Sequence, residues 1–167
     1  MSTGRRVLGL GAATIAAGAV TSVLLAPVSG GELVRLQVSF DPAYLAGQLA
    51  EWERTGALGS FTRHFAGDVV LIAAYAAWLP MLLRYLAARQ GRRVGPGVAR
   101  LPLVAAVADL VEDAAQLRLV AERPDVSTPL VVAGAGAACI KWGMLLATLA
   151  SALWVIRPRA AASDSPR

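Results

Sequence analysis

Acidic residues recur at helical spacing inside an apolar stretch of the chain. Asp109, Glu112, Asp113 and Gln116 fall at positions i, i+3, i+4 and i+7, which places them on one face of a helix. Lys141 lies inside the next apolar stretch. If these stretches cross a membrane, each ionised side chain near mid-span costs roughly 2.5–3.5 kcal/mol. Residues that are so costly indicate a site, and they are the first candidates for function.

The charges of this group do not balance. Glu112 lies about 18 Å along the helix from Arg100, near mid-span, and Lys141 has a similar depth, so the lysine can reach any of the three acids. Three carboxylates on one face repel one another and are poorly hydrated. We therefore expect at least one of Asp109, Glu112 and Asp113 to be protonated at neutral pH, or water or a cation to fill the space between them.

A second polar group is expected nearer the outer surface. Asp68 lies in the outer third of its apolar stretch, and Tyr75 continues its helical face. Because Gln116 and Arg118 have a similar depth on the neighbouring stretch, we predict that Asp68 pairs with Arg118 or bonds to Gln116. His64 lies at the outer boundary and is predicted to be a solvated cap. The candidate ligand-binding residues are Asp68, Tyr75, Asp109, Glu112, Asp113, Gln116 and Lys141.

The elements that position these residues are membrane spans. The chain has 167 residues, of which 56% are hydrophobic and 16% charged, a more apolar balance than in ordinary soluble domains. Runs of about 18 or more apolar residues indicate transmembrane helices. We predict one all-α membrane domain, a four-helix transmembrane bundle with an extracytoplasmic amphipathic helix. Its spans are 7–28, 65–86, 101–121 and 128–156, with an outer segment at 29–64 and a cytoplasmic tail at 157–167.

The first span also has features of a signal peptide. Arg5 and Arg6 precede an apolar run, as in twin-arginine signals, and a passable cleavage site follows Val28. The run is longer than the usual signal core, so a retained anchor is favoured, and cleavage would leave three spans. Small residues at four-residue spacing would let this helix pack closely against another: Gly9, Ala13 and Ala17 in one row, Ala12 and Ala16 in a second.

Basic residues predict the orientation. Ten of the sixteen Lys and Arg residues would lie on one side of the membrane: Arg5, Arg6, Arg84, Arg89, Arg92, Arg93, Arg100, Arg157, Arg159 and Arg167. Asp164 is the one acid expected there, whereas six acids lie on the other side. The positive-inside rule then places both termini in the cytoplasm. Arginines at the ends of apolar runs are topology signals, so no nucleic-acid partner is expected.

The outer segment is predicted to hold two elements. Residues 31–40 alternate between apolar and polar types, which predicts a short extended stretch. Asp41 and Pro42 then begin a helix that Gly56 ends. Its apolar stripe is Leu45, Leu49 and Trp52. The stripe fits an interfacial helix on the outer leaflet, or alternatively a lid over a cavity.

Several chemistries lack the residues they need. The single Cys139 allows no disulfide within the chain and no CxxC pair, which excludes thiol–disulfide chemistry of the quinone-reducing four-helix type. The lone His64 cannot build a His-rich metal site. The chain has no HExxH, phosphate loop or Ser/His/Asp set. We predict no metal and no cofactor.

The chain resembles a broad group of four-span bacterial membrane proteins that has no assigned activity. The shared features are an outer helix ending in Trp and Gly, an Asp-led second span, a third span with an Asp-x-x-Glu-Asn motif, and Lys-Trp in the fourth. The matching residues are Trp52, Gly56, Asp68, Tyr75, Pro80, Pro102, Asp109, Glu112, Lys141 and Trp142. Asp113 stands where the group usually has Asn. The resemblance implies the architecture and a bacterial cytoplasmic membrane.

Three functions fit these features. The leading hypothesis is an integral membrane protein with a polar site between spans two to four that binds a small ligand, a lipid or a cation. A second is a membrane-embedded acid–base enzyme acting on an isoprenoid or lipid, with Glu112, Asp109 or Lys141 as catalytic candidates. A third is a structural subunit, with a second copy or another membrane protein as its partner.

Overall fold

The computed structural model describes residues 2–157, which form six helices and no strand. The helices are α1 Thr3–Leu25, α2 Gly30–Gln37, α3 Pro42–Thr55, α4 Leu58–Arg89, α5 Pro96–Glu122 and α6 Thr128–Ile156. The all-helical prediction is confirmed for this part of the chain. Most of the expected cytoplasmic tail, including Arg159, Asp164 and Arg167, lies outside the described residues.

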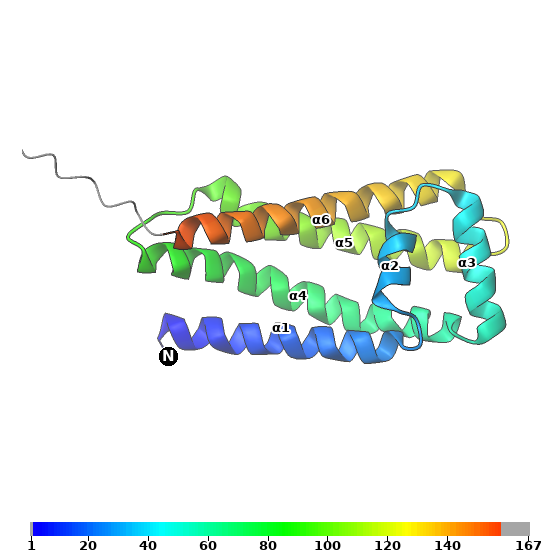
Figure 1. Ribbon diagram of the computed structural model, residues 1–167, viewed down its shortest axis with the longest axis horizontal. Coiled ribbons are helices and arrows are strands. Elements are labelled where there is room, and N and C mark those ends of the chain that lie inside the picture. The colour runs from blue at the N-terminus through cyan, green and yellow to red at the C-terminus, as the bar shows by residue number, and fades with distance from the viewer. Residues whose placement is uncertain (1, 158–167) are drawn as a thin grey trace, which may run out of the picture.

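Four long helices lie side by side along the molecule, and two short ones gather at one end. Figure 1 shows α1, α4, α5 and α6 running along the long axis, with α2 and α3 at the end away from the N-terminus. At the opposite end Arg92, in the α4–α5 connection, donates to the carbonyl oxygens of Trp154 and Val155 at 2.6 and 2.9 Å. These two hydrogen bonds hold the α4–α5 connection against the end of α6.

Three helices, α1, α4 and α6, are long and apolar enough to cross a membrane. The prediction of four spans is therefore confirmed in part, because α5 does not pass the same composition test. The second expected span also begins earlier than predicted, since α4 starts at Leu58 rather than near residue 65. Its extra turns include His64, whereas Asp68 already lay within the predicted span 65–86.

In its middle part, α5 has an apolar outer surface and an acidic interior face. Asp109, Glu112 and Asp113 are buried, with Glu112 at 0% exposure, whereas Val107 is 63% exposed. Further large apolar residues face outward on the same helix, namely Leu103, Val104, Leu110 and Val111. In water this arrangement would bury charge and hydrate apolar surface, and both changes are unfavourable.

Close contact between α1 and α4 depends on glycines. A Cβ at Gly11 of α1 would lie 3.0 Å from the Trp78 ring, and one at Gly67 of α4 would lie 2.8 Å from Thr21 Oγ1 and 3.3 Å from its Cα. Val7, Gly11, Thr14 and Thr21 are the buried positions along this side of α1. The predicted rows on Gly9 and Ala12 are exposed instead, because α4 meets a different face of α1.

Residues 30–37 form α2, and the predicted extended stretch at 31–40 is wrong. The Ser29 hydroxyl accepts from the Glu32 backbone N–H at 3.2 Å, and the Glu32 carboxylate accepts from the Ser29 N–H at 2.8 Å. This capping box satisfies two free backbone groups at once and starts a helix. The alternation of apolar and polar residues over 31–40 is too short to favour an extended strand over this capped helix.

The helix α3 forms with the predicted ends, but its apolar stripe packs inside the protein. The Asp41 carboxylate caps it by accepting from the Ala43 N–H at 2.9 Å, and Gly56 ends it with φ of 77°. Its stripe is buried in an apolar core under the end of the bundle, where Trp52 and Phe61 rings lie 4.7 Å apart. We call this core the aromatic plug: Leu45, Leu49, Trp52, Phe61, Phe65, Leu119 and Val131. Packing within the protein takes the place of the predicted lipid contact.

Candidate binding site in the bundle interior

Lys141 of α6 pairs with two carboxylates of α5. Its Nζ lies 2.8 Å from Asp109 Oδ1 and 2.6 Å from Glu112 Oε2, and all three side chains are almost fully buried. Helical spacing puts Asp109 and Glu112 one turn apart on the face of α5 that meets α6. The predicted contact between Lys141 and the deep acids is therefore present.

Neutral groups extend this pairing on both sides. The Tyr75 hydroxyl of α4 donates to Asp109 Oδ2 at 2.9 Å, and the Gln116 amide donates to Glu112 Oε1 at 2.8 Å. Asp109 thus accepts from a tyrosine and a lysine that come from different helices. The resulting chain of bonds joins α4, α5 and α6.

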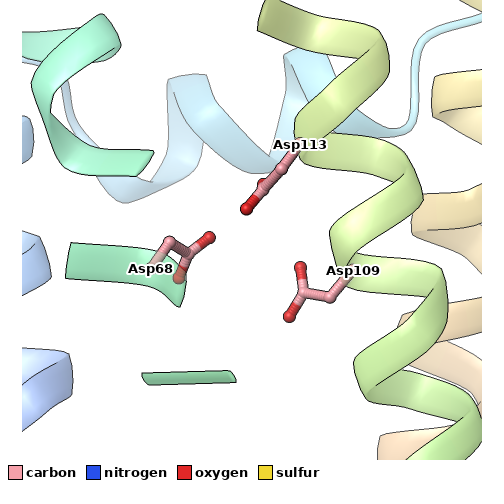
Figure 2. Close-up of side chains that lie close together, drawn as sticks. All are labelled: Asp68, Asp109 and Asp113. Atoms are coloured by element: carbon pink, nitrogen blue, oxygen red, sulfur yellow. The ribbon is translucent and has the colours of Figure 1, made fainter. Parts of the chain in front are cut away.

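Three carboxylates converge beside the ion pair. Figure 2 shows Asp68 pointing from α4 toward Asp109 and Asp113 on α5. One oxygen from each residue lies within 4.8 Å of the other two. We call this group the Asp triad. Ca²⁺ and similar hard cations bind carboxylate oxygens at about 2.3–2.6 Å, so oxygens at this spacing can share one ion. The sequence prediction of no metal is not tested by these distances.

Part of the Asp triad has no partner in residues 2–157. Asp113 is 5% exposed, and its Oδ2 is buried without a hydrogen bond to the described chain. Gln116 Oε1, one turn further along α5, is also buried and unpartnered. A buried polar atom without a partner costs about 1–3 kcal/mol, more when it is charged. The site is therefore incomplete as a purely structural salt-bridge network.

Asp68 belongs to the central group, and the predicted separate outer group is wrong. Arg118, its expected partner, is instead on the surface, where it bonds to Glu122 at 2.7 Å with 67% of its side chain exposed. Depth along single helices placed Asp68 too far out, because that count ignores how α4 is shifted relative to α5. All seven predicted ligand-binding residues belong to one connected cluster.

His64 was predicted to be a solvated cap, but it is 1% exposed. Its Nδ1 lies against the Phe61 carbonyl oxygen, one helical turn earlier on α4. His64 comes one helical turn before Asp68 on α4 and shares its face. That spacing was visible in the sequence, and it could have assigned His64 to the site.

A cleft reaches this cluster from the side of the bundle. It has a volume of about 550 Å³ and lies between α1 and α6. His64, Asp68, Tyr75, Asp109 and Lys141 form its polar floor. Its walls are mostly apolar, with Leu25 of α1, Leu71 and Leu79 of α4, and Leu145 of α6, while Leu33 and Val34 of α2 cover one end. The cleft exists because α1 packs along α4 rather than along α6.

The cluster has a clear chemical character. Four carboxyl groups face a single ammonium group among the described residues, and Lys141 already contacts two of those carboxylates. Asp68 and Asp113 keep acceptor oxygens without a cation. The arrangement can hold a positive charge, a proton or a hydrogen-bond donor.

Comparisons with known proteins do not indicate the role of this cluster. No family model matches the chain, and neither a curated protein nor a solved structure matches it significantly. The resemblance to four-span bacterial membrane proteins stays a prediction.

Proposed function

We propose that this chain is a four-span integral membrane protein that binds a positively charged ligand at the Asp triad. The observation that carries the proposal is the unpartnered, buried carboxylate of Asp113 beside two further carboxylates. A site that only holds helices together needs no acids beyond Asp109 and Glu112, which pair with Lys141. A cation supplies the missing partner.

The distribution of polarity on α5 supports a fourth span. Its three mid-helix acids, Asp109, Glu112 and Asp113, are buried among α4 and α6, and the large apolar side chains around them face outward. The exposed Arg118 lies toward the end of the helix. Ionisable residues in membrane spans usually face the bundle interior in this way. If α5 counts as a span, the arginine-rich α4–α5 connection and the end of α6 lie on the same side of the membrane, and Arg92 bonds to that end. The positive-inside rule then makes this the cytoplasmic side, together with both termini. The expected membrane is the bacterial cytoplasmic membrane, as the resemblance implies.

Cysteine labelling tests this topology. In a Cys139→Ser background, single cysteines at Ser2 and at Gly47 of α3 are treated with a membrane-impermeant maleimide in intact cells. We expect labelling at position 47 alone, and at position 2 only after the cells are opened. Labelling of both positions in intact cells would rule out the proposed orientation.

Protons are the competing way to neutralise the Asp triad. A protonated carboxyl group donates one hydrogen bond and needs no ligand. The two alternatives differ in a measurable way, because a cation that binds the folded protein raises its stability with concentration. At about 100 times its Kd, a ligand stabilises the folded state by roughly 2.7 kcal/mol.

Thermal unfolding in lipid nanodiscs measures that effect directly. The protein is titrated with Ca²⁺, Mn²⁺ or dodecylammonium, and we expect at least one to raise the midpoint. Asp68→Asn should abolish the shift, because it removes a charge without leaving a lysine unpaired. Glu122→Gln is the control, since it removes an acid that lies outside the Asp triad and pairs with Arg118 at the end of α5. The absence of any shift in the wild type, or an equal shift in Asp68→Asn, would reject the proposed function.

A further inference from the structure

We infer that the ligand of the Asp triad is the ammonium head of a single-chain amphiphile that enters from the membrane through the cleft between α1 and α6. This inference rests on the proposed cation site and names the class of molecule that fills it. It joins two independent observations, the surplus of carboxylates and an apolar side opening that leads to them.

The walls of the cleft fit an aliphatic chain. Leucines from α1, α4 and α6 line the cleft, and Thr14, Thr21 and Ser22 add hydroxyl groups on the α1 side. The volume of about 550 Å³ is in the range of small-molecule sites. A hydrated metal ion would make no favourable contact with these apolar walls. A long aliphatic tail fills it and excludes water from the acids beneath.

The floor of the cleft selects a positive head. Asp68 and Asp109 line the cleft, and an oxygen of Asp113 lies within 4.8 Å of theirs. Lys141 also reaches the cleft, but its charge is already matched by Asp109 and Glu112. An anionic head would meet uncompensated carboxylates, whereas a primary ammonium can donate three hydrogen bonds to them.

The cleft is closed at one end and open along its side. Residues of α2 cover the end near the aromatic plug, including Leu33 and Val34. Among the described residues, α1 and α6 both pack against α4 but not substantially against each other, and α4 lies between them in Figure 1. If the four long helices span the bilayer, the open side faces lipid, so a molecule dissolved in the membrane reaches the acids without crossing water.

Photo-crosslinking in nanodiscs tests this inference. The probe is dodecylamine with a diazirine on its tail, and the sites of reaction are mapped by mass spectrometry. We expect crosslinks on cleft residues such as Leu71 and Leu145 rather than on the outward-facing Leu146. Unlabelled dodecylamine should compete at least tenfold better than dodecanoate or dodecanol, which have the same tail with an anionic or a neutral head.

Two variants make the result specific. Leu145→Trp fills the cleft and should reduce crosslinking at least fivefold, whereas Leu146→Trp places the same ring on the outer surface and should leave it unchanged. Equal competition by the three amphiphiles, or crosslinks spread over the outward face, would overturn the inference. A midpoint shift with Ca²⁺ but none with dodecylammonium would also overturn it while leaving the cation site in place, and failure of every cation would reject the proposed function itself.

Discussion

The aromatic plug and the Asp triad are both buried in the same bundle, but the plug is apolar and the triad consists of carboxyl groups. In the plug, Phe61 is 0% exposed and packs against the rings of Trp52, His64 and Phe65 without any charged partner. A short distance along α4, buried carboxylates crowd together with fewer cations than they need. The side chains of the plug need no partner beyond one another, whereas two of the three carboxylates of the Asp triad have no positively charged partner among the described residues. This difference separates the part that holds the fold from the part proposed to bind.

Loss of Lys141 is expected to have the largest effect on the charged region. Lys141→Met leaves Asp109 and Glu112 buried without their cation, which should cost roughly 3–5 kcal/mol in unfolding free energy. Equilibrium unfolding in nanodiscs measures the change. Adding Asp109→Asn and Glu112→Gln should restore most of the stability, since neutral groups no longer need the lysine. No rescue by these two changes would mean that the lysine acts by packing alone.

A comparable loss is expected in the plug, with a different consequence for binding. Phe61→Ala removes a fully buried ring and should cost about 3–5 kcal/mol. Phe40→Ala, at an exposed ring, is the control and should change little. Below its lowered midpoint, Phe61→Ala should bind cations with wild-type affinity by calorimetric titration. A binding defect at that temperature would show that the two regions are not separable.

Gly67 connects the two regions through the contact between α1 and α4. Gly67→Ala puts a Cβ against Thr21, including its backbone, so α1 and α4 must move apart next to Asp68. We expect a cost of roughly 1–3 kcal/mol and weaker cation binding. Gly9→Ala has open space around its Cβ and should leave both measurements unchanged. An unchanged Gly67→Ala protein would contradict the close packing.

The smallest effect is expected where α2 covers the cleft. Ser29→Ala removes half of the capping box and should raise amide exchange in α2, for a cost of about 1 kcal/mol. Hydrogen bonding to Ser29, through its side chain and its backbone, lowers the pKa of Glu32. The stabilisation is therefore present above the unfolded-state pKa and lost as the pH falls through the folded one. Protection of the α2 amides, measured relative to their intrinsic exchange rates, should fall on acidification, and protection that does not fall would argue against this cap.

Sequence periodicity predicted what lies on one helix but not how helices meet. The spacing of Asp109, Glu112 and Asp113 gave their shared face, because helix geometry alone determines it. The position of Asp68 was predicted wrongly, because its depth depends on where α4 begins and how α5 lies beside it. The cleft was beyond prediction, since it results from α1 packing along α4 rather than α6. The α2 helix was predictable from Ser29 and Glu32, whose spacing fits a capping box.

The most direct test of the central claim is the unfolding free energy of Asp113→Asn with and without a cation. Without one, the variant should be more stable than the wild type by about 1–3 kcal/mol, since it relieves an unpartnered buried carboxylate. With the most stabilising cation among Ca²⁺, Mn²⁺ and dodecylammonium at saturation, the order should reverse, because the wild type alone gains the full binding energy. A variant that is less stable than the wild type under both conditions would contradict the account.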